Sequence, residues 1–205
     1  GGRWKTSTLW GVLRIRFVSD PVWYFCLFWL PGYLQEDSGL TLIQVGWVGW
    51  IPFLFGAVGG VLTSAWSDKM VRKGMDPLRA RKRMMTLVAV AAPLCIFTPY
   101  FNALPPYWNV AAIIASFSLI AIMCLSWLYT ICVVIAEAFP VKNVASVVGI
   151  TAGAGAVGGA VFNIFIGSLL ATMGNVLFAV MGVMHLVTAV ILWRMVRHET
   201  PKTVK

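Results

Sequence analysis

The sequence predicts an all-α membrane protein with six transmembrane helices. Apolar residues make up 60% of the 205 residues, charged residues only 11%, and the mean hydropathy is +0.84. A soluble domain carries about 25% charged residues, so this chain is too apolar for that class. The apolar residues also occur in runs of about 20, the length that a helix needs to cross a bilayer.

Six such runs follow one another, separated by residues that end helices. The separators with the clearest turn chemistry are 35–39, 102–106, 139–140 and 173–175. We therefore expect one six-helix domain over 8–198, flanked by short segments at 1–7 and 199–205. The expected spans are 8–34, 42–66, 85–101, 108–136, 144–172 and 175–196.

The positions of the basic residues agree with six crossings. All 16 lysines and arginines fall into four groups, which an even number of crossings brings to one side of the membrane. Removing one crossing would scatter them over both sides. Because basic loops stay in the cytoplasm, we expect both termini there. The groups are Arg3, Lys5, Arg14 and Arg16; Lys69, Arg72, Lys73, Arg79, Arg81, Lys82 and Arg83; Lys142; and Arg194, Arg197, Lys202 and Lys205.

Composition also excludes several functions. The net charge of +9 is a topology signal, with a contact to anionic membrane lipid, and no nucleic-acid motif accompanies it. The cysteines lie inside apolar runs, where thiols pack as small hydrophobes. Without a CxxC motif, and with two histidines, we expect no disulfide, no metal and no cofactor. We expect no enzyme activity, because His185 has no acid near it in sequence. The cysteines are Cys26, Cys95, Cys124 and Cys132.

The second run ends in GGVLTSAWSDKMVRKG, residues 59–74. Here Asp68 ends a helix beside Lys69 and Arg72, and a carboxylate in this place can also face the positive N-terminus of a neighbouring helix. Such a charge cluster can form in one conformation and break in another. Asp68, Lys69 and Arg72 are therefore candidate gating residues, and the alternative is a helix-ending turn with solvated charges.

The fifth run is rich in small residues. Gly149 and Gly153, and likewise Gly155 and Gly159, are four residues apart, so each pair lies on one helix face and permits close approach of another helix in lipid. The GAGAVG stretch at 153–158 matches GxGxxG, but it lies inside an apolar run and no acid follows it closely. We expect helix packing here and not dinucleotide binding.

Three segments together resemble one transporter family. DPVWYFCLFWLPGYL (20–34), the 59–74 segment and EAFPVKNVASVVGITAGAGAVGG (137–159) are similar to the anion:cation symporters of the major facilitator superfamily. The nearest branch is that of the bacterial hexuronate and aldonate transporters. In the second segment, Ser64 replaces the usual glycine. The resemblance covers nearly the whole chain and matches helices seven to twelve, the C-terminal half of a twelve-helix protein.

The resemblance implies half of a proton-coupled transporter for a sugar acid or related organic anion, in the bacterial inner membrane. Its partner would be the N-terminal six-helix half, with the site near the bilayer midplane between the halves. The family's main carboxylate-binding arginine and best-supported proton-carrying acids belong to that absent half, so none is transferred here. The alternatives are a transporter of another carboxylate or a neutral sugar, and a non-transporting scaffold.

The first run contains a charged pair inside an apolar helix. Arg16 and Asp20 are four residues apart and share a helix face, and Pro21 removes a backbone donor and kinks the helix. An intramembrane charge normally faces the bundle interior or water. We expect Arg16 to meet an anionic substrate group, and Asp20 to hold Arg16 or exchange a proton. The alternatives are an internal salt bridge, or an Asp20 that caps a helix starting at Pro21.

Nearby aromatic and polar side chains are candidate substrate contacts. Trp23 and Tyr24 follow Asp20 by three and four residues, and sugar rings offer apolar faces to an indole and hydroxyls to a phenol. The resemblance adds Trp127, because a tryptophan recurs at this place in the hexuronate-like branch, and Thr130 lies near it.

Two further residues have roles that the sequence leaves open. A buried amide in lipid needs partners, so Asn163 either joins helices or touches the sugar. Glu137, near a cytoplasmic helix end, is a candidate gating partner of Lys142 or of the basic loop.

Overall fold

The computed structural model describes residues 2–197, with side chains for residues 7–166 and 176–197. Every regular element in this part is helical, which confirms the all-α prediction. In chain order, the elements are α1 (Gly2–Glu36), α2 (Leu42–Val48), α3 (Ile51–Arg72), α4 (Pro77–Val90), the 3₁₀ helix η1 (Ala92–Ala103), α5 (Pro106–Ala138) and α6 (Val141–Met195).

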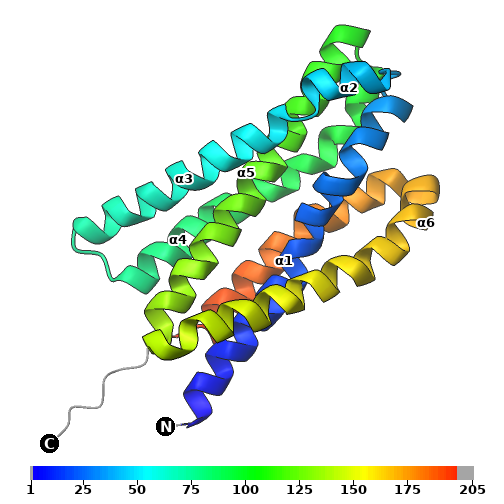
Figure 1. Cartoon of the computed structure of the whole chain (residues 1–205). Helices are drawn as coiled ribbons and strands as arrows, with labels where there is room; N and C mark the ends of the chain where they lie inside the picture. Colours follow the sequence, from blue (N-terminus) through cyan, green and yellow to red (C-terminus); the bar gives the residue numbers. More distant parts are fainter. Residues whose placement is uncertain (1, 198–205) are drawn as a thin grey trace, which may run out of the picture.

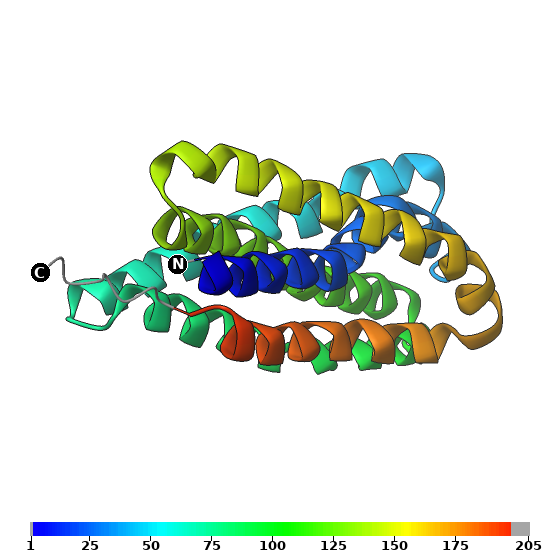
Figure 2. The ribbon, with the colours of Figure 1, turned by 90° about the horizontal axis from the view of Figure 1, so that it is seen from below.

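The long helix α6 folds back on itself. Figures 1 and 2 show a first arm that runs away from the end of α5 and a second arm that returns along the bundle. The arms contain the apolar stretches Val141–Ile166 and Val176–Met195. The reversal lies between them, in the region where the sequence suggested a break.

Within the described residues, five stretches are long and apolar enough to cross a membrane, which indicates a multi-pass membrane protein. They coincide with the second to sixth expected spans. The first expected span, 8–34, is helical as part of α1 but is not among the five, and six crossings remain a prediction. The five are Leu42–Arg72, Pro77–Ala103, Pro106–Ala138, Val141–Ile166 and Val176–Met195.

Helix α1 continues through both of its prolines, Pro21 and Pro31. At about 1.5 Å per residue, its 35 residues extend about 52 Å. Because the helix starts at Gly2, Asp20 lies near its middle. The alternative in which Asp20 caps a helix starting at Pro21 is therefore wrong.

Local sequence signals set the turns at several helix ends. Gly39 and Gly74 have positive φ angles of 66° and 91°, a conformation that glycine adopts without steric cost. Thr41 and Gln44 form a capping box at the start of α2. The Asp76 carboxylate accepts a hydrogen bond from the Arg79 backbone N–H at 2.9 Å, which caps α4.

The bundle core forms where α1 packs against α5 and α6. An aromatic cluster connects these three helices, with ring centroids 5.7 to 6.2 Å apart. Helix α3 packs on the other side of α5. A Cβ at Gly56 or Gly60 of α3 would collide with α5, so glycine allows this close contact. The aromatic cluster consists of Phe25, Tyr33, Phe117 and Phe178.

The two ends of the bundle differ in charge. Figure 1 shows the start of α1, the α3–α4 connection, the α5–α6 connection and the end of α6 at one end. Most of the basic residues belong to these segments, so we call this the basic end, whereas Arg14 and Arg16 lie further along α1. Lys202 and Lys205 lie outside the described residues. The α1–α2 and η1–α5 connections and the α6 reversal lie at the opposite end.

Candidate functional site

A buried ion pair lies near the middle of α1. The Arg16 Nη2 atom is 3.0 Å from the Asp20 Oδ2 atom, and the two side chains are only 11% and 14% exposed. The Ser19 hydroxyl donates a hydrogen bond of 3.2 Å to the other Asp20 carboxylate oxygen. The sequence-predicted pair is therefore formed in this conformation, as the internal salt bridge that one interpretation expected.

The ion pair leaves one donor of Arg16 unused. Its Nη1 atom is buried and has no hydrogen-bond partner among the described residues. A buried, unpaired charged donor is costly, so a structure normally provides a partner for it. A carboxylate oxygen is a strong acceptor for a guanidinium and would satisfy this atom.

The ion pair borders a small cavity of about 130 Å³ between α1 and α5. Its volume suits the acidic end of a small molecule and not a whole sugar acid together with its water shell. Two of the predicted substrate contacts, Trp23 and Tyr24, share this cavity with the ion pair. The lining residues are Arg16, Ser19, Asp20, Trp23, Tyr24, Cys124 and Leu128.

The two aromatic side chains at this cavity are fixed by other rings. Tyr24 stacks on Phe28 with ring centroids 6.0 Å apart. Trp23 meets Phe53 of α3 edge to face at 5.7 Å. Both residues remain partly exposed, so a ligand in an adjacent cavity could reach them.

Trp127 and Thr130 do not line this cavity. The Trp127 ring is 2% exposed, its indole N–H donates to the Met85 carbonyl at 3.0 Å, and it packs edge to face on His185 at 5.5 Å. Thr130 is buried, and its hydroxyl has no partner among the described residues. The structure therefore places Trp127 in the packing between α4, α5 and α6, and substrate contact by either residue stays a prediction.

Asn163 joins two helices in this conformation. Its side-chain oxygen accepts a hydrogen bond of 3.0 Å from the Trp29 indole N–H of α1. Its amide nitrogen donates to the Gly159 carbonyl at 2.8 Å within α6. Of the two roles that the sequence left open, this geometry corresponds to helix joining.

Arg81 connects three helices at the basic end. Its side chain is 8% exposed, and its Nη1 and Nη2 atoms lie 2.5 Å from an Asp68 oxygen and 3.1 Å from a Glu137 oxygen. It also donates to the buried Ser67 hydroxyl. We expected Lys69 and Arg72 beside Asp68, and either Lys142 or the basic loop, to which Arg81 belongs, as the partner of Glu137.

In the part of the chain that the structure describes, Asp68 and Glu137 instead share Arg81. Lys69, Arg72 and Lys142 are exposed and have no ion pair there. The predicted partners lie close to the two acids in the sequence, whereas Arg81 comes from another helix, α4, and is buried between the two acids. Sequence reasoning missed Arg81, although Leu78, Arg81, Met85 and Ala89 share one helix face and the other three are apolar.

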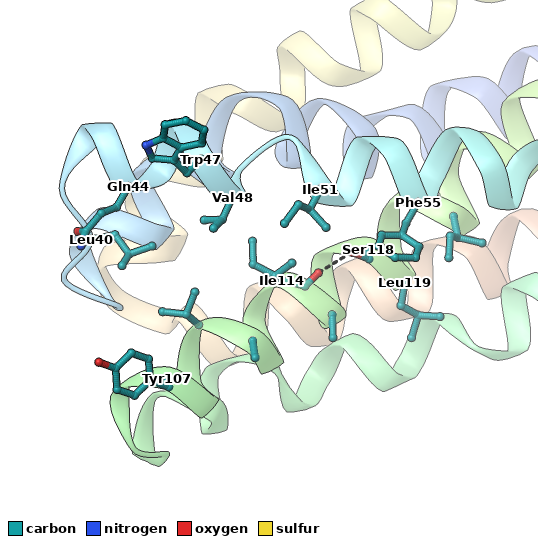
Figure 3. A pocket seen from close by; sticks show the side chains of 14 residues that line it. Leu40, Gln44, Trp47, Val48, Ile51, Phe55, Tyr107, Ile114, Ser118 and Leu119 are labelled. Atoms are coloured by element: carbon teal, nitrogen blue, oxygen red, sulfur yellow. Dashed lines mark hydrogen bonds between the residues drawn. The ribbon is translucent and has the colours of Figure 1, made fainter.

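A larger cavity of about 850 Å³ lies between α2, α3 and α5 near the opposite end (Figure 3). Its lining is almost entirely apolar, apart from Gln44, Ser118 and the Tyr107 hydroxyl. The Ser118 hydroxyl already donates to the Ile114 carbonyl at 2.7 Å. No charged side chain lines this cavity, so it offers no cationic partner for the carboxylate of an organic anion.

Among the described residues, no three His, Cys, Asp or Glu side chains group closely enough to hold a metal ion. The arrangement around Arg16 can bind and orient an anion, because it presents a buried cationic donor at a cavity. This is the geometry of a binding site.

Curated proteins similar to this chain are named as sugar-acid transporters. The hexuronate transporter of Escherichia coli is 26% identical over 201 residues, which cover 95% of this chain and 44% of that protein. The probable galactarate/D-glucarate transporter GarP of E. coli is 36% identical over 86 residues, covering 42% of this chain and 19% of that protein. The probable L-galactonate transporter of E. coli is 39% identical over 79 residues, covering 38% and 17%. No family model matches the chain.

The names of the homologues indicate first a general class of protein and then a narrower group of substrates. They are transporters, which confirms that the chain is not an enzyme. More narrowly, they are hexuronate, galactarate/glucarate and galactonate transporters, anion transporters of the major facilitator superfamily, as the resemblance predicted. The chain spans less than half the length of these relatives.

Proposed function

We propose that this chain is the C-terminal half of a secondary active transporter that carries a sugar acid or related organic anion across the cytoplasmic membrane. The names of the homologues support an organic anion as substrate. The alignment with 44% of the hexuronate transporter supports a further half outside this chain. That half would be the N-terminal six-helix unit, and movement of the two halves would expose the site to each side in turn.

The proposed topology has six crossings and both termini in the cytoplasm. Helix α1 supplies the crossing that is missing from the five apolar stretches. Its length exceeds the thickness of the hydrocarbon core, about 30 Å, and it packs inside the bundle. The basic end then faces the cytoplasm, as expected for loops rich in lysine and arginine. In this arrangement Arg16 and Asp20 lie inside the membrane.

The single observation that carries the proposal is the buried Arg16 with its unused Nη1 atom. We assign Arg16 to the carboxylate of the substrate and Asp20 to two tasks. Asp20 holds the guanidinium when the site is empty, and it is the candidate for taking up the coupled proton. Tyr24 and Trp23 border the same cavity and would contact the sugar portion.

We assign the Arg81 cluster to gating at the cytoplasmic end. Arg81 bridges α3 and α5 through Asp68 and Glu137, so these contacts have to break if the helix ends separate. Lys69 and Arg72 are exposed beside the cluster, where they would pair with acids of the other half or with lipid headgroups.

The test is uptake by the full-length protein in proteoliposomes. D-Glucuronate, D-glucarate and L-galactonate are offered as radiolabelled probes, with and without an inward proton gradient. We expect at least one probe to accumulate, dependent on the gradient, and Arg16→Ala to abolish that uptake. Arg14→Ala is the matched control, because Arg14 is an exposed cation on the same helix.

Three results would count against the proposal. Uptake of none of the three probes would contradict a sugar-acid substrate. Accumulation of a probe to the same level with and without the proton gradient would contradict proton coupling. Full uptake by Arg16→Ala would remove Arg16 from the site.

A further inference from the structure

The first arm of α6 crosses α1 through three glycines. A Cβ built on Gly155, Gly158 or Gly159 would collide with α1. In contrast, a Cβ on Gly149 or Gly153 would meet no heavy atom within 4 Å. Of the two glycine pairs that the sequence suggested, only Gly155 and Gly159 pack against another helix of this chain.

The three contacts differ in what each glycine faces. A Cβ on Gly158 would meet the Phe17 main-chain carbonyl, and one on Gly159 would meet the Tyr24 ring. A Cβ on Gly155 would meet the Asp20 carboxylate, and its nearest atom there is Oδ2. That oxygen is the one that pairs with Arg16 Nη2 at 3.0 Å.

Any side chain at position 155 therefore displaces the oxygen that holds Arg16. The carboxylate can move toward the small cavity that Asp20 lines, but this movement would disturb the hydrogen bond that its other oxygen accepts from Ser19. A displaced Oδ2 would release Nη2 and allow the guanidinium to rotate. The unused Nη1 atom is buried and belongs to a residue that lines the small cavity, and it would then lose its fixed direction.

We propose that Gly155 is a positioning residue of the Arg16–Asp20 site. Because glycine has no side chain, the Asp20 carboxylate fits against position 155. In this position the carboxylate holds the Arg16 guanidinium in an orientation that leaves one donor free for an anionic ligand. The effect on ligands rests on the function proposed above, whereas the coupling between Gly155 and Asp20 does not. The binding site is thus completed by a backbone position on a helix other than the one that carries the charges.

The experiment compares three alanine variants of the full-length protein. Uptake of whichever of D-glucuronate, D-glucarate and L-galactonate the unmodified protein accumulates is measured as a function of probe concentration. We expect Gly155→Ala to raise KM tenfold or more. Gly158→Ala, which meets main chain and not the ion pair, should lower the thermal unfolding midpoint but change KM less than threefold. Gly153→Ala should change neither. An equal KM increase for Gly155→Ala and Gly158→Ala would overturn the proposal, because both would then act through helix packing.

A second measurement needs no transport. The thermal unfolding midpoint of the purified full-length protein is determined for Gly155→Ala in two backgrounds, the natural sequence and Arg16→Met/Asp20→Ala, which removes both charges together. We expect Gly155→Ala to lower the midpoint in the natural background and to have at most a third of that effect in the second. Equal shifts in both backgrounds would show that Gly155 does not act through Asp20. If the coupling is found but no probe is transported, the proposed function fails and the positioning role stands.

Discussion

Removing the Arg81 guanidinium should destabilise the protein less than removing the two carboxylates that bind it. The Arg81 side chain is 8% exposed, whereas those of Asp68 and Glu137 are 53% and 27% exposed. In Arg81→Met, water can solvate both carboxylates, and the loss is that of two partly screened ion pairs, about 1–2 kcal/mol. In Asp68→Ala/Glu137→Ala, the buried guanidinium has no carboxylate, a situation that costs about 3–5 kcal/mol.

The assay is the unfolding midpoint of the purified full-length protein in an SDS titration. The double variant should be less stable than Arg81→Met by about 2 kcal/mol, following from the two estimates. Adding Arg81→Met to the double variant should restore part of the lost stability. The exposed cations Lys69 and Arg72 supply the controls, since Lys69→Met and Arg72→Met should shift stability by less than about 0.5 kcal/mol. If Arg81→Met proves the most destabilising change, burial of the charge is not what governs this cluster.

Three further predictions concern packing, and each is read from the same titration. In Gly60→Ala the new Cβ meets the Tyr129 ring and the Leu125 main chain, so we expect a loss of stability of about 1–3 kcal/mol. The control Gly46→Ala, whose Cβ meets nothing within 4 Å, should not change stability. Equal losses for the two variants would argue against the α3–α5 contact. Trp127→Phe removes the hydrogen bond to the Met85 carbonyl and should lower stability by about 1–3 kcal/mol. The KM for uptake should change less than threefold. A tenfold increase in KM at unchanged stability would instead make Trp127 a substrate contact. Asn163→Leu leaves the Trp29 indole without its acceptor and should lower stability by about 1–3 kcal/mol. Trp29→Phe introduced into this variant should lower stability little further. Strictly additive losses would mean that the Trp29–Asn163 hydrogen bond contributes nothing to stability.

The sequence was sufficient for features that depend on spacing along one helix. Arg16 and Asp20 form a pair because residues four apart share a helix face, and the apolar runs predicted the helices that follow α1. The turn at 35–39 was also readable, and Gly39 adopts a positive φ angle there. The turn at Gly74 and the Asp76 cap of α4 were not predicted.

Features that depend on how two helices rotate against each other were not readable. Helix α5 is apolar around most of its circumference, so nothing in its sequence tells whether Trp127 faces the cavity or the interior. The same holds for the α6 glycines, of which Gly155 meets α1 and Gly153 meets open space. Arg81 was missed because its partners come from α3 and α5, and only the packing of three helices brings them together.

The account depends most on the two ends of the bundle lying on opposite sides of the membrane, with the basic end in the cytoplasm. Opposite sides keep the Arg16–Asp20 pair, near the middle of α1, inside the membrane. Two matched positions test it. Tyr107, at the start of α5, is 92% exposed, and Val141, at the start of α6, is 90% exposed. Tyr107→Cys and Val141→Cys are each introduced into the full-length protein and treated in intact cells with a membrane-impermeant maleimide. The account predicts that Tyr107→Cys reacts at once and that Val141→Cys reacts only after the cells are permeabilised. Labelling of Val141→Cys in intact cells would contradict it.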